Sequence, residues 1–278
     1  MQATALRYAP RLGGSPSGDL GKRCTLPYMV RDATSASAVS DSRPAAPQAG
    51  YDIIADEYYE PRHITSRNFD AATRAYLYER PFSFPNHGLA LDLGAGKGRL
   101  GEYCRVAPTR IVHADVALRM LTLPERELAV GRVLADALAL PFKTGVFTIV
   151  AAFLFDPFNE RGLFAQVARV MSRDGMFIGT IPHYEWGLAL RSGIGKSLDE
   201  AIFALKGGER IARPSVLSRP EHLADDLTGV GLQIVKNEAL TLPRDVTRIS
   251  PDIEVPARVM RESVYRIPIV QLVIATRV

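Results

Sequence analysis

The stretch Leu89-Ala-Leu-Asp92-Leu-Gly94-Ala-Gly96-Lys-Gly98 decides the fold of this chain. It opens with a short apolar run and continues into a glycine-rich turn, and Leu100, Tyr103 and Cys104 then recur at helical spacing. Glycine permits positive φ angles and lets a ligand approach the backbone closely, because it has no Cβ. The stretch therefore predicts a strand, a tight turn and a helix whose first amide groups can bind a carboxylate or a phosphate.

Strands and helices alternate in the sequence on both sides of this turn. Two helices are expected before it, through Tyr51–Tyr59 and Arg67–Arg80. Further strands are expected at Arg110–Ala114, Arg132–Ala135, Val146–Phe153, Met176–Ile181, Leu232–Leu242 and Ile267–Thr276, and further helices at Ala117–Leu121, Glu160–Met171 and Pro220–Leu227. Asp174-Gly175 is expected to turn the chain into the strand at Met176. The alternation predicts an α/β fold, doubly wound, with a mostly parallel sheet covered on both faces.

Two segments fall outside this alternation. Residues 1–48 are rich in Ala, Ser, Pro and Gly and show no periodicity, so a disordered tail is expected before a domain of residues 49–278. An irregular insertion runs from about residue 183 to 215, and its Leu198–Leu205 part has helical spacing. We expect this insertion to cap a ligand pocket and shield it from water.

Composition narrows the class of protein. The chain has 278 residues, of which 47% are hydrophobic and 23% charged, which excludes collagen-like and wholly disordered chains. Its formal charge of +4 is scattered, so nucleic acid is not favoured as a partner. Cys24 and Cys104 have no partner at metal-ligand spacing, and no metal site is expected. No apolar run approaches a membrane span, so no membrane segment is expected and a cytoplasmic location is the default.

The glycine-rich turn fits two classes of ligand. Asp92 to Gly98 has the form D-x-G-x-G-x-G, whereas Gly96 to Gly101 has the dinucleotide form G-x-G-x-x-G. A Walker-type phosphate loop is excluded here, because Lys97 is followed by Gly98 rather than by Ser or Thr. The glycines alone leave both remaining classes open.

Two more carboxylates are expected at the same edge of the sheet. Asp115 closes the second predicted strand and Asp136 follows the third. Ligands of open parallel sheets bind outside the carboxyl ends of the strands, so both side chains should face one cleft. An acid after the second strand can accept the ribose hydroxyls of either ligand class, and a polar residue after the third suits an adenine edge. Hydrogen bonds of this charge-assisted kind contribute about 1.5–3 kcal/mol each.

The order and spacing of these motifs resemble the class I S-adenosylmethionine-dependent methyltransferases of the type 11-like, small-molecule kind. The resemblance rests on Leu91–Gly98, Asp115–Leu121, Ala135–Phe142, Phe147–Val150 and Ala168–Gly175. It implies a Rossmann-like sheet of seven strands with an antiparallel last strand, lead-in helices at the N-terminal side, and S-adenosylmethionine as cofactor. Three positions depart from the family pattern: Thr148 stands for the usual Asp, Ala117 for Ser, and Asp174-Gly175 for Gly-Gly.

The resemblance also implies a role for each matching residue around the cofactor. Gly94, Gly96 and Gly98 would line the methionine moiety, and Asp92 would support the loop or the ammonium. Asp115 would hold the ribose, Val116 and Met120 would flank the adenine, and Asp136 and the Ala137 amide would meet the adenine amino group. Phe153 would lie under the sulfonium, and Tyr51 and Tyr58 would close over the cofactor.

The acceptor implied is a small organic molecule that is methylated on oxygen, nitrogen or carbon. Methyl transfer needs alignment above all, and a base only where the acceptor loses a proton. The catalytic residue is therefore left unassigned, with His183, Glu185 and Asp156 as candidates; other acceptor-side groups are Asn159, Tyr184, Trp186 and His63. A nucleic-acid or protein N-methyltransferase, an NAD-dependent oxidoreductase and a non-catalytic cofactor binder remain as alternatives. No particular oligomeric state is predicted.

Overall fold

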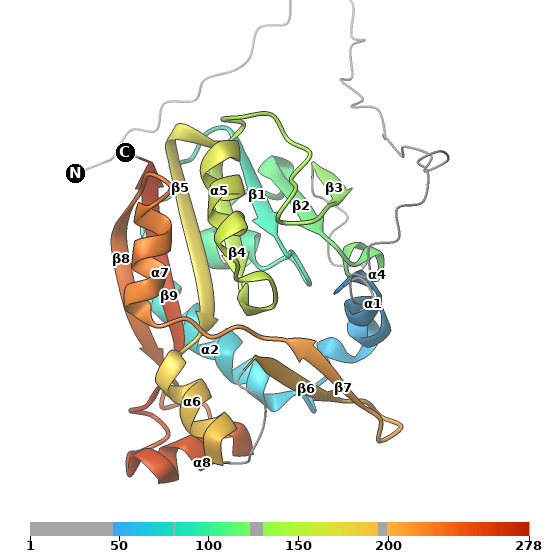
Figure 1. Ribbon diagram of the computed structural model, residues 1–278, viewed down its shortest axis with the longest axis vertical. Helices are drawn as coiled ribbons and strands as arrows, with labels where there is room; N and C mark the ends of the chain where they lie inside the picture. Colours follow the sequence, from blue (N-terminus) through green and yellow to red (C-terminus); the bar gives the residue numbers. More distant parts are fainter. Residues whose placement is uncertain (1–46, 80–81, 123–129, 194–198, 278) are drawn as a thin grey trace, which may run out of the picture. The chain divides into compact units, whose positions relative to one another are not determined.

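A seven-stranded sheet, in the order β3-β2-β1-β4-β5-β9-β8, occupies the centre of the structure (Figure 1). The computed structural model describes residues 47–79, 82–122, 130–193 and 199–277, so nearly all of the predicted tail lies outside the described residues. The strands of the sheet are β1 (Leu89–Leu93), β2 (Ile111–Asp115), β3 (Gly131–Leu134), β4 (Phe147–Phe153), β5 (Met171–Pro182), β8 (Leu232–Thr241) and β9 (Pro268–Arg277). Within this sheet only β9 runs antiparallel to its neighbours, which confirms the predicted fold class.

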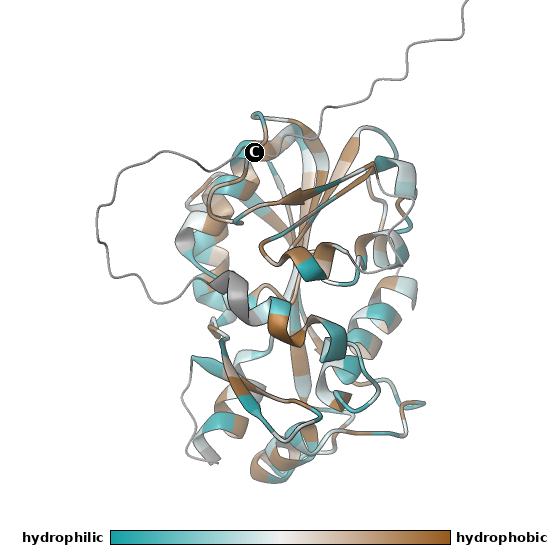
Figure 2. Ribbon diagram, turned by 90° about the vertical axis from the view of Figure 1, so that its right-hand side faces the viewer, coloured by the Kyte–Doolittle hydropathy of each residue, from teal (hydrophilic) through white to brown (hydrophobic). Residues whose placement is uncertain are grey.

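Helices cover both faces of the sheet. They are α1 (Pro47–Tyr58), α2 (Ile64–Glu79), α3 (Leu100–Cys104), α4 (Leu118–Leu121), α5 (Arg161–Val170), α6 (Tyr184–Gly193), α7 (Pro220–Thr228) and α8 (Pro251–Met260). Helices α5 and α7 pack their apolar residues into the core on one face, and α2, α3, α6 and α8 do so on the other. Figure 2 shows the central strands largely in the hydrophobic colour and the helices in mixed colours, as expected for strands buried on both faces. No described helix combines the length and apolar character that a membrane crossing needs.

The direction of chain crossover changes at β1. The chain passes from β1 to β2 and β3 on one side and then returns to β4 on the other side of β1. Two neighbouring crossovers therefore diverge at the carboxyl end of β1, and ligands of open α/β sheets bind at such a point. The glycine-rich turn directly follows this end of the strand.

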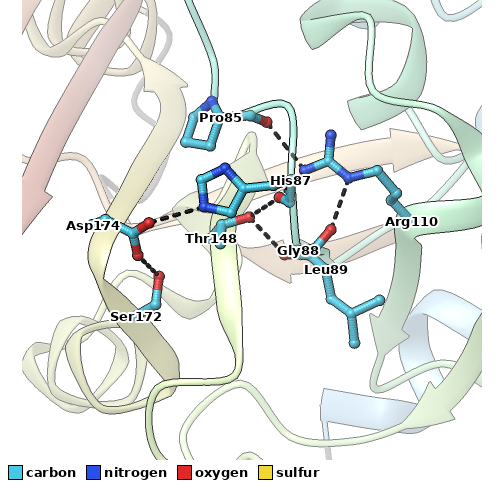
Figure 3. A network of polar contacts seen from close by, with 8 residues as sticks. All are labelled: Pro85, His87, Gly88, Leu89, Arg110, Thr148, Ser172 and Asp174. Atoms are coloured by element: carbon cyan, nitrogen blue, oxygen red, sulfur yellow. Dashed lines mark hydrogen bonds and ion pairs between the residues drawn. The ribbon is translucent and has the colours of Figure 1, made fainter.

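The start of β5 differs from the prediction. Asp174 and Gly175 lie within β5, which begins at Met171, and the register against β4 is irregular between Phe147 and Ile149. The predicted turn is therefore wrong: these residues form an irregularity inside the strand rather than a connection before it. Asp174 reaches His87, which follows α2, with its Oδ2 2.9 Å from the His87 Nε2 (Figure 3).

Thr148, which replaces the Asp usual in the resembling family, has a local role at the start of β4. Its Oγ1 donates to the carbonyl of His87 at 2.6 Å, and the Arg110 guanidinium donates to the carbonyls of Pro85 and Gly88 in the same segment (Figure 3). These bonds tie the approach to β1 onto β4 and β2 at the amino ends of the strands. The departure from the family pattern therefore lies at the sheet edge opposite the glycine-rich turn.

The insertion contains a β-hairpin where a helix was expected. Strands β6 (Glu200–Ala204) and β7 (Arg210–Pro214) pair antiparallel, with Phe203 opposite Ile211. The helical interpretation of Leu198–Leu205 is wrong because the residues of β6 alternate between exposed and half-buried, the period of a strand. Figure 1 places the hairpin beside α1 and α2, next to the carboxyl ends of the central strands.

Candidate cofactor and acceptor site

The turn after β1 has the backbone that its glycines predict. Gly94, Gly96 and Gly98 have φ angles of +61°, +43° and +82°, which side-chain-bearing residues rarely adopt. A Cβ on Gly94 would lie 2.6 Å from Cζ of Phe158, and one on Gly96 would overlap the hydroxyl of Tyr59. The turn is thus a bare backbone surface against which aromatic groups lie closely.

Asp115 fixes this turn from the end of β2. Its Oδ2 accepts a hydrogen bond from the Gly96 amide and its Oδ1 one from the Ala117 amide, both at 2.9 Å. The side chain is only 7% exposed. A carboxylate has acceptor capacity for several hydrogen bonds, so Asp115 has the chemistry to support the turn and to hold a hydroxyl of a ligand.

The third predicted acid lies at the same edge. The carbonyl of Asp115 accepts from the Ala135 amide at 3.0 Å, which joins the end of β2 to the segment after β3. Asp136 follows directly, is exposed, and accepts from the Leu138 amide at 2.9 Å. Ala137 beside it is buried. Asp115 and Asp136 therefore follow adjacent strands on the same side of the glycine-rich turn, as predicted.

Aromatic residues of the lead-in helix cover this edge. Tyr51, Tyr58 and Tyr59 pack against a small cluster of Ala55, Ala117 and the buried Met120, while Val116 is half-buried. Burial raises the pKa of Tyr58, and the nearby carboxylates of Asp156 and Asp115 raise it further, so its hydroxyl stays protonated. Tyr58 and Met120 therefore lie in one cluster near the end of β2.

Helix α1 is also held by polar contacts to two neighbouring elements. Asp52 accepts from the Arg119 amide of α4 at 2.8 Å, and Asp56 pairs with the Arg119 side chain. Next to Asp56 in the sequence, Glu57 accepts from the Lys206 amide in the hairpin turn at 2.9 Å. The helix therefore bridges α4 and the β6–β7 hairpin.

The remaining predicted cofactor residues contact other side chains. The buried Asp92 carboxylate meets Nδ1 of His113 on β2 at 3.0 Å, which joins the ends of β1 and β2. Phe153 ends β4 and packs edge-to-face on Tyr103 of α3, with ring centroids 4.8 Å apart. Asp92 pairs with Ala151, and Phe153 follows two residues later at the end of β4.

The three candidates for a catalytic base differ in their surroundings. His183 follows β5 and is 7% exposed, and its Nδ1 has no hydrogen-bond partner among the described residues. Burial lowers its pKa, so the imidazole is neutral near pH 7. Glu185 is exposed in the first turn of α6, where its carboxylate interacts favourably with the helix dipole. His183 is therefore buried and has a ring nitrogen without a hydrogen-bond partner among the described residues, whereas Glu185 is exposed.

The third candidate, Asp156, lies in a buried network behind the hairpin. Its Oδ2 accepts from the Ser215 hydroxyl at 2.6 Å, and Arg191 of α6 donates to that hydroxyl at 2.6 Å and to the Ser215 carbonyl at 2.8 Å. Asp156 belongs to a short 3₁₀ helix after β4, Asp156–Phe158. Burial raises the pKa of Asp156 to about 6, although Ser215 and Arg191 oppose the shift.

The raised pKa of Asp156 predicts a pH dependence of stability. Its ordinary value is 3.8, so between roughly pH 4 and pH 6 the unfolded chain loses this proton while the folded chain keeps it. Folding stability therefore falls as pH rises through this window, by up to about 3 kcal/mol, since one pKa unit corresponds to about 1.4 kcal/mol. We expect Asp156→Asn, which can still accept from Ser215, to lose this contribution. Urea unfolding at several pH values checks it; parallel curves for the two proteins would contradict it.

The other predicted acceptor-side groups have structural partners. Trp186, which the sequence offers either as a packing residue or as an acceptor wall, is a packing residue: it is buried, packs edge-to-face on Phe69, and donates to the Asp252 carbonyl at 2.9 Å. Asn159 is buried and donates to the Ser218 hydroxyl at 2.7 Å. Tyr184 and His63 are half-buried, Tyr184 under the Arg219 guanidinium and His63 beside Phe203.

Comparisons with known proteins decide between the two ligand classes of the turn. Residues 91–179, which include the turn and the end of β4, match the family model of the methyltransferase domain. The chain carries a class I S-adenosylmethionine-dependent methyltransferase domain. The D-x-G-x-G-x-G interpretation of Asp92–Gly98 therefore holds, and S-adenosylmethionine is the cofactor of this domain.

Solved structures share the fold of this methyltransferase domain. An S-adenosylmethionine-dependent methyltransferase from Mesorhizobium loti matches with a TM-score of 0.52 at 17% identity, covering 75% of this chain and 100% of that one. Geranyl diphosphate C-methyltransferase from Streptomyces coelicolor matches with a TM-score of 0.56 at 13% identity, covering 85% and 100%. The human protein named arginine-hydroxylase NDUFAF5, mitochondrial, is 36% identical over 110 residues, 38% of this chain. The chain covers only 31% of that human protein.

The residues present fit S-adenosylmethionine. The positive φ angles leave room for close approach to the backbone, and Asp115 and Asp136 place two carboxylates at the neighbouring strand ends. Sequence reasoning missed two side chains of the methyltransferase site, Tyr59 and Phe158, which lie against Gly96 and Gly94. Only the aromatic character of the segments after α1 and β4 could have indicated them, because the contacts are tertiary.

Proposed function

We propose that this protein transfers a methyl group to an oxygen, nitrogen or carbon atom of a small organic molecule that is enclosed beneath the insertion. The observation that carries this proposal is the position of the β6–β7 hairpin. Phe203 of β6 stacks on Tyr58 with ring centroids 5.4 Å apart, and Ser215 after β7 bonds Asp156. Tyr58 and Asp156 are both at the cofactor edge, so the hairpin covers the side from which an acceptor would approach. A covered site favours a small acceptor over a nucleic acid or a folded protein.

The chain's own residues supply positioning and exclusion of water. When bound, S-adenosylmethionine supplies a methyl group on a positively charged sulfur, open to attack by an oriented lone pair. We assign the methionine part of the cofactor to Gly94, Gly96 and Gly98, the ribose to Asp115, and the adenine to its neighbours Val116, Met120, Asp136 and Ala137. Phe153, at the end of β4, would face the sulfur. Alignment of this kind lowers a barrier by about 7–11 kcal/mol.

His183 is our candidate for the group that removes a proton from the acceptor. Its neutral, buried imidazole can take the proton that an acceptor O–H or N–H loses as the new bond to carbon forms. We expect His183→Ala to lower kcat by about 100-fold with an unchanged cofactor Kd. An unchanged kcat would remove His183 from this role.

Isothermal titration with S-adenosylmethionine tests the binding half of the proposal, and absence of binding by the folded protein at millimolar cofactor would end it. Incubation with a metabolite extract, followed by mass spectrometry, tests the acceptor. The expected product gains one methyl group. The human relative is named an arginine-hydroxylase, so a product that gains one oxygen instead would contradict methyl transfer.

Two finer points stay predictions. Binding of DNA or RNA that weakens steeply with salt would favour a nucleic-acid substrate instead, since phosphate contacts release counterions. The cytoplasmic location is checked by fractionation of cells expressing the tagged chain; the name of the human relative describes that protein as mitochondrial.

A further inference from the structure

The β6–β7 hairpin presents one of its arginines to the inside. In β6 and β7, Ala201, Phe203, Ile211 and Arg213 are half-buried, whereas the residues between them are exposed. Side chains of a strand alternate between its two faces, so these four form a single inner face. Arg213 is the cation on that face.

Contacts on either side of Arg213 locate it near the cofactor edge. Phe203, on the same face, stacks on Tyr58, and Ser215, two residues beyond Arg213 on the same face, bonds Asp156. Arg213 therefore lies between the two points at which the hairpin meets the site. Its cross-strand partner in the hairpin is the small Ala201, which leaves room beside the guanidinium.

The guanidinium of Arg213 has a hydrogen-bond donor that no described residue accepts from. Its Nη1 donates to the Ala212 carbonyl at 2.6 Å, while its Nε is buried with no hydrogen-bond partner among the described residues. No carboxylate in the described part of the chain forms an ion pair with it. Buried donors without a partner are costly, and a guanidinium presents a fork of donors that matches a carboxylate or a phosphate. Burial raises the pKa of Tyr51, and the positive charge of Arg213 opposes this shift. The guanidinium therefore lies close enough to Tyr51 of α1 to affect it electrostatically.

We propose that Arg213 binds an anionic group, a carboxylate or a phosphate, of the methyl acceptor. This inference rests on the proposed function and specifies its substrate class. An anion paired with Arg213 would satisfy the buried Nε and would fix the acceptor against the inner face of the hairpin. A neutral acceptor would leave that donor unpaired.

The test uses the full chain saturated with S-adenosylhomocysteine and three probes that share an aromatic ring: benzoate, phenyl phosphate and methyl benzoate. Isothermal titration should show binding of at least one of the two anions and much weaker binding of the neutral ester. In Arg213→Gln the affinity for the anion should fall about 10- to 100-fold. Arg210→Gln is the matched control, because it removes the same charge from the exposed face of the same strand and should bind the anion normally.

The outcomes separate this proposal from the proposed function. Normal binding of S-adenosylhomocysteine by Arg213→Gln, together with loss of the anion, supports the proposal. Loss of the cofactor product itself in this variant would make Arg213 a cofactor contact and would overturn it. Equal anion binding by both variants, equal binding of the ester, or no binding of either anion would also overturn it. Failure of the unmodified protein to bind S-adenosylhomocysteine would instead count against methyl transfer.

Discussion

Gly96→Ala will weaken S-adenosylmethionine binding by at least about 100-fold while the protein remains folded. Gly96 has a φ of +43°, and its Cβ position is occupied by the Tyr59 hydroxyl. Its amide also donates to Asp115 at 2.9 Å. Alanine in this conformation costs about 1 kcal/mol, but it also displaces Tyr59 and shifts the surface on which the cofactor would lie. Isothermal titration measures the binding, and urea unfolding measures the stability.

The matched control for Gly96 is Gly145, in the turn before β4. Its φ is +72°, and a Cβ there would meet nothing within 4 Å. Gly145→Ala therefore introduces the same kind of backbone strain at the amino ends of the strands, away from the site. We expect a similar small loss of stability with an unchanged cofactor Kd. If both variants lost cofactor equally, strain alone would explain the effect and the turn would lose its assigned role.

The central sheet was predictable because its signals are local. The apolar run of β1 ends at a glycine-rich turn, β2 ends at Asp115, and Asp136 follows β3. The residue types at these positions therefore mark where each strand ends. The second strand was predicted as Arg110–Ala114 and is Ile111–Asp115, a shift of one residue. Parallel strands that are buried on both faces are continuous apolar runs in the sequence. This pattern does not depend on which helices pack on the sheet.

The hairpin was missed because short amphipathic segments are ambiguous. Leu198 and Leu205 fit a helical spacing, yet Ala201 and Phe203 also fit a period of two. The Gly207-Gly208 pair between β6 and β7 was the signal for a hairpin turn, and Gly208 has a φ of +85°. Helix α8 was likewise missed, although Ser250 caps it and Pro251 occupies its first position.

The site was predictable only on its cofactor side. Glycines and strand-end acids follow from strand order, whereas Tyr59 on Gly96 and Ser215 on Asp156 join elements far apart in the sequence. Trp186 shows how packing fixes an orientation: although it follows β5, where the cleft was expected, it packs against Phe69 in the core. Tertiary packing overrides position in the chain wherever an apolar side chain can reach the core.

Asp115→Asn tests the other half of the cofactor site and should weaken S-adenosylmethionine binding by about 10- to 100-fold. The carboxylate accepts from two backbone amides, of Gly96 and Ala117. An Asn side chain has one carbonyl oxygen, so its NH₂ group would face one of these donors, and a buried amide would lose its partner. The free energy of unfolding should therefore fall by about 1–3 kcal/mol.

Asp136→Asn is the comparison for Asp115→Asn, because we expect Asp136 to contact the cofactor without supporting the glycine-rich turn. Asp136 is exposed and accepts from a single amide, that of Leu138, and the Asn carbonyl can replace this bond. We therefore expect Asp136→Asn to leave the unfolding free energy unchanged and to weaken cofactor binding less than Asp115→Asn does. If Asp115→Asn lost stability but bound the cofactor normally, Asp115 would only support the turn, and the ribose would have to be held elsewhere at this edge of the sheet.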